Sequence, residues 1–211
     1  MEKELEIMQT LLSDFKDMFF EIYLAGSHKL SFINNPKDCD IIIISETEEQ
    51  SKELKRLFYE KHPRKEFREK YNYDLHFISD YREQEIFNRT AHYPYITYIK
   101  YDVYNNNFEF KETRGISLED FIANKDKYKE RYLYLIDEWI ESLKRRNKEE
   151  HFYDIKIFYY MYTTLSILNN QSFELTEEQI ENINILHDRK EEDLEKRKEL
   201  ITKLIEDVKE I

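Results

Sequence analysis

Apolar and polar positions alternate with different periods along the first half of the chain. Apolar residues recur at helical spacing over residues 2–17, and a short apolar run that ends at Ala25 predicts a buried strand. The run Ile41–Ile44 is short, continuous and β-branched, which is typical of a second buried strand. Helical spacing over 47–59 and alternation over 71–78 predict a helix and a third strand.

The pattern changes near the middle of the sequence. An aromatic run to Tyr104, a turn at Asn105–Asn107 and a short strand over 108–111 predict a hairpin. After Gly115 the spacing is helical, with a break expected near His187. The expected helices span 117–124, 126–147, 151–169 and 176–210.

These elements predict an α/β (α+β) fold in two parts. Residues 1–115 should form a domain with a small mixed β-sheet and helices, and residues 116–211 an α-helical C-terminal domain. The narrow apolar stripe of the last helix is expected to pack on its own domain, with a dimer seam as the minor alternative.

Composition excludes several classes of protein. The 211 residues include 33 Lys and Arg against 45 Asp and Glu, a net charge of −12 that argues against a general nucleic-acid coat. The single cysteine, Cys39, excludes an internal disulfide and a cysteine-built zinc site. Only Gly26 and Gly115 occur, so a multi-glycine phosphate loop cannot form. Without a signal-peptide pattern or a membrane-length apolar run, the expected location is the cytoplasm, with no membrane partner.

Three aspartates lie on predicted strands. Asp38 and Asp40 are two residues apart, so both carboxylates should lie on one face of their strand, and Asp74 lies on a later strand. Two unit charges ~4 Å apart repel by about 4 kcal/mol at an effective dielectric constant near 20, and a divalent cation would reverse this cost. Carboxylate oxygens suit Mg²⁺ or Mn²⁺, which makes these aspartates candidate metal ligands. His76, on the face of Asp74, should either hydrogen-bond to that carboxylate or simply pack.

Candidate phosphate contacts lie on both sides of these carboxylates. Gly26 and Ser27 follow a predicted strand and precede a possible helical turn, where backbone N–H groups and a hydroxyl can receive a triphosphate. Lys29 follows directly, and Lys156 lies on an otherwise aromatic helix, where it is either a nucleotide contact or a surface lysine. The basic run 64–68 is read as a solvated loop or a small basic patch for nucleotide or RNA.

The ordered set of these residues resembles a known signature. Gly26 and Ser27, ten intervening residues, an Asp-x-Asp at Asp38 and Asp40, and Asp74 in a later strand are similar to the DNA-polymerase-β-type nucleotidyltransferase superfamily, in particular to small bacterial and phage members. The resemblance covers about residues 18–80. It implies a nucleotidyltransferase domain followed by a helical domain, and Mg²⁺-dependent transfer of a nucleoside monophosphate from an NTP, such as ATP, to a hydroxyl, with release of pyrophosphate.

The resemblance also implies roles for individual residues. Asp38 and Asp40 would bind metal, Asp74 would be the third ligand and general base, and Gly26 and Ser27 would hold the β- and γ-phosphates. The acceptor would be a small molecule, a protein hydroxyl or a tRNA end, and the acidic balance of the chain disfavours long RNA.

Two other functions stay open on the sequence. One is a non-catalytic, antitoxin-like binding protein of the same fold. The other is a ribonuclease of the HEPN kind, because Arg146, His151 and Tyr153 match its Arg-x4-His-x-Tyr motif. That motif falls near the start of the helical half here and not in its final helix.

Overall fold

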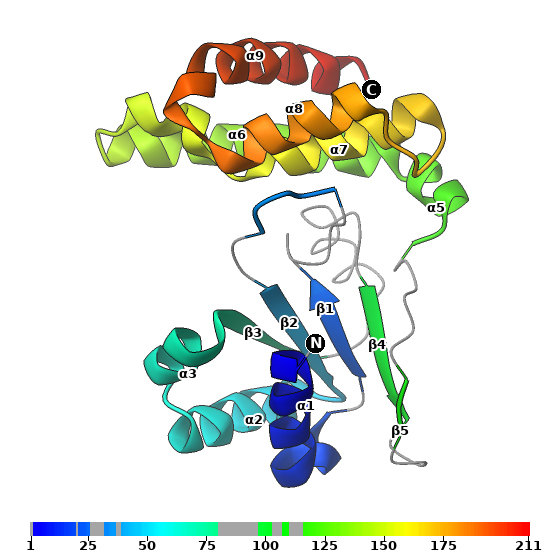
Figure 1. The fold of residues 1–211 in the computed structure, drawn as a ribbon, viewed down its shortest axis with the longest axis vertical. Helices are drawn as coiled ribbons and strands as arrows, with labels where there is room; N and C mark the ends of the chain where they lie inside the picture. Colours follow the sequence, from blue (N-terminus) through cyan, green and yellow to red (C-terminus); the bar gives the residue numbers. More distant parts are fainter. Residues whose placement is uncertain are drawn as a thin grey trace. The chain divides into compact units, whose positions relative to one another are not determined.

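The computed structural model describes residues 2–19, 21–25, 32–36, 39–79, 97–102, 107–109 and 116–211. The chain is of the mixed α and β class and divides into two compact units (Figure 1). Among the described residues, the first unit holds the sheet and three α-helices, and the second holds the helices after Ile116 together with residues 32–35. Each unit is described by itself below.

The first unit is built on a mixed sheet with the strand order β3-β2-β1-β4-β5. Strand β2 pairs in parallel with β3 and antiparallel with β1, and the β1–β4 and β4–β5 pairs are antiparallel. The mixed sheet and the hairpin predicted from the sequence are confirmed. The strands are β1 (Glu21–Ala25), β2 (Cys39–Ser45), β3 (Tyr73–Ser79), β4 (Thr97–Asp102) and β5 (Asn107–Glu109).

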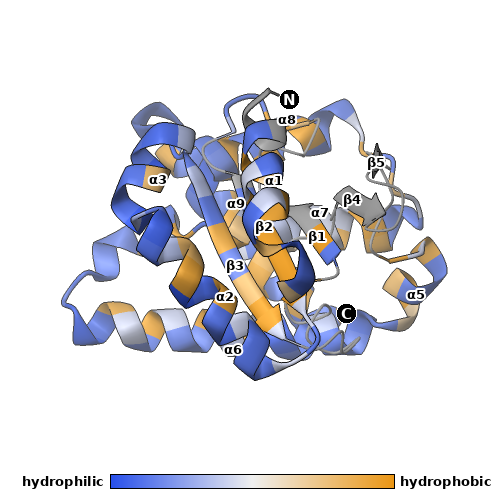
Figure 2. Cartoon of the chain, turned by 90° about the horizontal axis from the view of Figure 1, so that it is seen from below, coloured by the Kyte–Doolittle hydropathy of each residue, from blue (hydrophilic) through white to orange (hydrophobic). Residues whose placement is uncertain are grey.

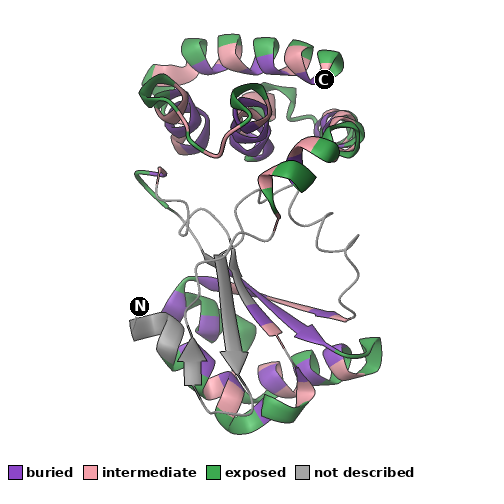
Figure 3. Ribbon diagram, turned by 90° about the vertical axis from the view of Figure 1, so that its right-hand side faces the viewer, coloured by how far each residue is buried: buried purple, intermediate pink, exposed green. Residues whose placement is uncertain are grey.

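Three helices contribute to the core on one face of this sheet: α1 (Glu2–Phe15), α2 (Glu48–Lys61) and α3 (Arg64–Tyr71). A short 3₁₀ turn, η1 (Lys16–Met18), follows α1. Hydrophobic residues run along β2 and β3 (Figure 2), and the helices turn their buried positions inward (Figure 3). The shared core includes Ile7, Leu11, Ile22, Ile41, Ile43, Leu54, Phe58, Phe67 and Leu75.

Helix α3 replaces the loop that the sequence predicted over 64–68. Pro63 directly precedes the helix, and Asn72 ends it in the left-handed conformation with φ 60°, donating its N–H to the Arg68 carbonyl. Phe67 and Tyr71, four residues apart, give α3 a buried face. The basic residues between them therefore have a fixed helical spacing.

The described residues of the second unit after Ile116 form helices, and α7 is the most buried of them, with ten buried residues. Helix α9 packs against α6, α7 and α8, so the prediction that its apolar stripe packs on its own domain is confirmed. The elements are α5 (Leu118–Ala123), α6 (Lys125–Arg145), η3 (Glu149–Asp154), α7 (Ile157–Asn170), α8 (Glu177–Asp188), η4 (Glu191–Asp193) and α9 (Leu194–Glu210).

Two predicted helices of this half have interruptions. The predicted helix 151–169 is in fact the 3₁₀ segment η3 followed by α7, because Ile155 has extended backbone angles and separates the two. The predicted break near His187 is confirmed, and it lies at Arg189, which ends α8 with φ 55°.

Residues 32–35 are held on α8 by hydrogen bonds within this unit. The Asn184 side chain donates to the Phe32 carbonyl and accepts from the Asn34 N–H, both at 2.8 Å. Asn35 donates to Asp188 at 2.9 Å. Residues 32–35, which belong to the second unit, are thus tied to α8.

Within the described part of the chain, none of the helices has the length and apolar character that crossing a membrane requires.

Candidate functional site

Asp40 and Asp74 lie side by side on the two parallel strands. Asp40 of β2 is the direct register partner of Asp74 of β3, and the next aligned pair on that face is Ile42 with His76. Paired residues of neighbouring strands point to the same face, and Ile41, Ile43 and Leu75 on the other face belong to the helix-covered core. The sheet therefore brings two of the three predicted acids together on the face opposite that core.

His76 contacts Asp40 and not the aspartate of its own strand. Its Nε2 lies 2.9 Å from Asp40 Oδ1, a hydrogen bond between strands. Asp40 is 8% exposed, so this bond holds a largely buried carboxylate in one orientation. The sequence predicted a hydrogen bond or simple packing at Asp74; the structure gives the bond to Asp40, because the register places the two strands' residues diagonally close.

Asp74 is contacted by two arginines from α3. Arg68 Nη2 lies 3.1 Å from Asp74 Oδ2, and Arg64 Nη2 lies 3.6 Å from Oδ1. Because α3 runs directly into β3 through Asn72, this helix is fixed next to the edge strand that carries Asp74. The sequence placed both arginines in a solvated loop or a small basic patch for nucleotide or RNA, and did not relate them to Asp74. Their helical (i, i+4) spacing was the signal that could have paired them.

The carboxylates fit a divalent cation in one specific respect. Asp74 Oδ1 is buried and has no hydrogen-bond partner among the described residues, although a buried oxygen of this kind normally has one. A hard cation such as Mg²⁺ binds carboxylate oxygens of this kind. Within the described ranges, no group of three or more His, Cys, Asp or Glu side chains is arranged to hold a metal ion, and Asp40 and Asp74 are a pair.

Four of the predicted site residues lie outside the described residues. They are Gly26, Ser27, Lys29 and Asp38. The backbone next to them is described: Ala25, the last residue of β1, is the register partner of Asp40.

The remaining candidates belong to the helical unit. Lys156 directly precedes α7 and is exposed, so it does not lie among that helix's buried aromatic residues. Arg146 ends α6, and His151 lies in η3, exposed, with its Nδ1 3.3 Å from Asp154 Oδ2. The ribonuclease-like residues are thus in an exposed connection between two helices.

Comparison of the chain with protein-family models, with curated proteins and with solved structures gives no match.

Proposed function

We propose that this protein is a metal-dependent nucleotidyltransferase, whose 1–115 part is the nucleotidyltransferase domain and whose 116–211 part is the helical domain. The observation that carries the proposal is the register pairing of Asp40 with Asp74. Two carboxylates on adjacent strands repel one another, and a bound divalent cation turns that repulsion into attraction. The ordered Gly-Ser, Asp-x-Asp and third aspartate of the sequence support the same reaction class.

Asp40 and Asp74, together with Asp38, would hold Mg²⁺ or Mn²⁺ in this proposal. When bound, the cations neutralise charge at the transferring phosphorus and activate the attacking hydroxyl. Asp74 accepts the proton of the acceptor hydroxyl while the oxygen of that hydroxyl bonds to the α-phosphorus of the NTP. The bond from the α-phosphorus to the oxygen that bridges it to the β-phosphorus breaks, which releases pyrophosphate. His76 fixes the orientation of Asp40 through their 2.9 Å hydrogen bond.

The phosphates of the NTP are assigned to the residues that follow β1. Gly26 allows close backbone approach, and Ser27 and Lys29 supply a hydroxyl and a positive charge. Lys156, which the sequence predicts as a nucleotide contact, stays a prediction. The net charge of −12 favours a small molecule or a protein hydroxyl as the acceptor over a long RNA, with a tRNA end as the remaining class.

One observation favours the non-catalytic alternative. Arg68 already pairs with Asp74 at 3.1 Å. A non-catalytic binding protein of the same fold would have such an ion pair at this position, because its Asp74 would not need to bind a metal ion. In the enzyme, Asp74 would bind the cation in place of Arg68. In the binding protein, the ion pair between Arg68 and Asp74 would remain.

The test is thermal unfolding with each of the four NTPs, with and without Mg²⁺. A ligand at 100 times its dissociation constant stabilises a protein by about 2.7 kcal/mol, which is a readily measured rise in Tm. We expect a rise that needs both NTP and Mg²⁺ in the wild type and is lost in Asp40→Asn and Asp74→Asn.

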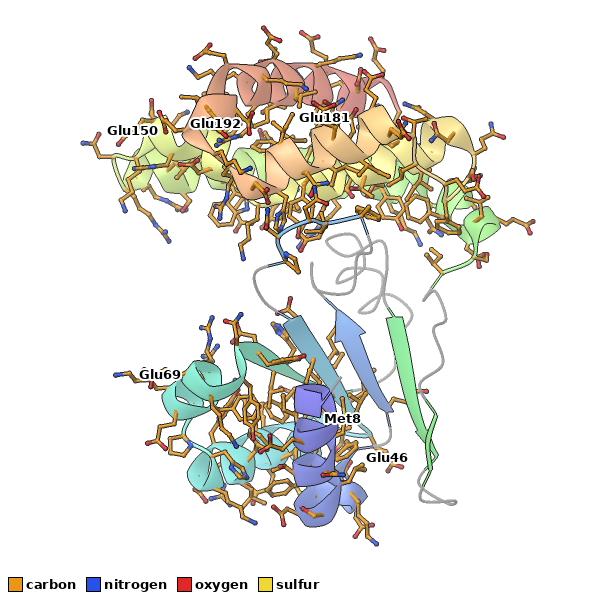
Figure 4. The ribbon with its side chains drawn as sticks, in the orientation of Figure 1. Met8, Glu46, Glu69, Glu150, Glu181 and Glu192 are labelled. Carbon is orange, nitrogen blue, oxygen red and sulfur yellow. The ribbon has the colours of Figure 1, made fainter. Side chains whose placement is uncertain are left out.

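The matched control is Glu46→Gln, which removes the same charge from an exposed residue at the other end of β2 (Figure 4). It should keep the full shift. The absence of a shift with every NTP, or an equal shift in Asp40→Asn, would contradict the proposal.

A further inference from the structure

Two arginines on α3 share a single carboxylate. Arg64 and Arg68 are four residues apart and so lie on one face of the helix, and both guanidinium groups approach Asp74, at 3.6 and 3.1 Å. Their side chains are 62% and 53% exposed, whereas that of Asp74 is 19% exposed. The carboxylate is thus largely enclosed while the two cations still face solvent.

The neighbouring lysines of α3 have other carboxylate partners. Lys65 lies 3.9 Å from Glu69, and Lys70 lies 2.7 Å from Glu6. Glu69 points outward from the helix (Figure 4). The cluster of Arg64, Arg68 and Asp74 carries one net positive charge, which the carboxylate of Asp40, the register partner of Asp74, balances.

A stabilising role alone accounts poorly for this cluster. The side chains of both arginines are more than half exposed, so solvent screens their attraction to Asp74 and the two pairs add little to the stability of the fold. Asp74 Oδ1 is buried without a hydrogen bond, and Arg64 Nη2, which approaches it, lies 3.6 Å away, beyond hydrogen-bond distance. The two arginines therefore leave one oxygen of this carboxylate without a hydrogen bond.

A hydroxyl adjoins the same cluster. Burial raises the pKa of Tyr59 on α2, while Arg64, Asp74 and Arg68 are near enough for their charges to act on it as well. Tyr59 therefore keeps its proton at neutral pH and is available as a hydrogen-bond donor. Its ring packs edge-on against Phe77 of β3, 5.8 Å between centroids, which holds it beside the edge strand.

We infer that Arg64 and Arg68 form a binding site for a phosphate group of a substrate. A guanidinium group presents paired N–H donors that match phosphate oxygens. If Asp74 binds a divalent cation, its carboxylate no longer pairs with Arg64 and Arg68. The two arginines then bind the phosphate group instead. This inference rests on the proposed function, and it adds that a phosphate lies at the β3 edge of the site, on the other side of β2 from β1.

The phosphate has two sources, the NTP or a phosphorylated acceptor, and the experiment separates them. Isothermal titration follows three probes: Mn²⁺ alone, a non-hydrolysable ATP analogue with Mg²⁺, and a 5′-phosphorylated triadenylate RNA with Mg²⁺. The variants are Arg64→Gln, Arg68→Gln and the double variant. Lys65→Gln is the matched control, because it removes the same charge from the same helix but from the pair with Glu69.

We expect the double variant to lose about tenfold or more in affinity for one of the two phosphate probes, because it removes charged hydrogen bonds to the phosphate. Loss for the ATP analogue assigns the phosphate to the NTP, and loss for the trinucleotide assigns it to the acceptor. The affinity for Mn²⁺ should stay equal or increase, because a competing cation has been removed from Asp74.

Unchanged affinity for both phosphate probes in the double variant, or an equal loss in Lys65→Gln, would overturn the inference. The Mn²⁺ titration distinguishes a failure of this inference from a failure of the proposed function. If the wild type binds Mn²⁺ and the arginine variants behave like wild type, the inference fails and the proposed function stands. If the wild type binds no Mn²⁺, with or without the ATP analogue, the proposed function itself fails.

Discussion

Neutralising Asp40 should stabilise the metal-free protein. Neighbouring strands lie about 4.8 Å apart, so the aligned carboxylates of Asp40 and Asp74 are separated by roughly 5 Å. Two unit charges at ~5 Å repel by about 3 kcal/mol at an effective dielectric constant of 20. His76 and Arg68 offset part of this repulsion, because each lies within about a hydrogen bond's length of one carboxylate. Asp40→Asn, which keeps an oxygen acceptor for His76, should therefore raise the free energy of unfolding by about 1 kcal/mol, with about 3 kcal/mol as the upper bound.

The assay is urea denaturation at pH 8 in EDTA, with the midpoint and slope fitted for wild type, Asp40→Asn and Glu46→Gln. Glu46 is exposed and its substitution should change stability by less than about 0.5 kcal/mol. Adding Mg²⁺ should then stabilise the wild type and reverse the order of wild type and Asp40→Asn. A metal-free Asp40→Asn that is less stable than wild type by about 1 kcal/mol or more would refute the reasoning, because the carboxylate would then be net stabilising where it stands.

Three further predictions concern the helical unit. Asn184→Ala removes both bonds to residues 32–34, so the Asn34 amide should exchange its hydrogen faster by about tenfold or more, measured by hydrogen exchange with mass spectrometry, while core amides stay unchanged. Arg197 is 2% exposed and donates to Asp154 at 2.9 Å and to the Lys190 carbonyl at 2.6 Å. Arg197→Leu should lower the free energy of unfolding, measured by urea denaturation, by about 2–4 kcal/mol. A decrease below about 1 kcal/mol would show that these hydrogen bonds are dispensable. Burial alone would raise the pKa of Asp188, but hydrogen bonds from His187 and Asn35 hold it below the ordinary value of 3.8. Its contribution to stability is therefore present above that value and is lost as the pH falls through the folded-state pKa. Between pH 6 and 3, the free energy of unfolding should fall less steeply with decreasing pH for Asp188→Asn than for wild type. An equal pH dependence of the two proteins would refute the assignment.

The hydrophobic pattern was sufficient to predict the sheet elements of the first unit. The isoleucine run of β2 and the alternation in β3 identify strands because each period matches one backbone geometry. Helix α3 was missed because its many charged residues resemble a solvated loop, and only Phe67 and Tyr71 mark its buried face. A short helix with two apolar residues gives too weak a period to detect.

The partners of the site residues were harder to predict than the elements. Sequence spacing relates His76 to Asp74, two residues away on one strand, whereas the structure joins it to Asp40 through the strand register. Register depends on how the two strands pair, and neither strand's sequence specifies that alone. Buried Arg197 was missed for a related reason, because a charged residue at a core-facing helix position does not add to an apolar stripe.

Direct measurement of bound Mn²⁺ is the sharpest test of the central claim that Asp40 and Asp74 form a divalent-cation site for an NTP. Electron paramagnetic resonance counts free Mn²⁺ as it is titrated into the protein with a non-hydrolysable ATP analogue. The wild type and Glu46→Gln should bind the ion at the same affinity, and Asp40→Asn and Asp74→Asn should each weaken it by about tenfold or more. Equal Mn²⁺ binding in all four proteins would contradict the account.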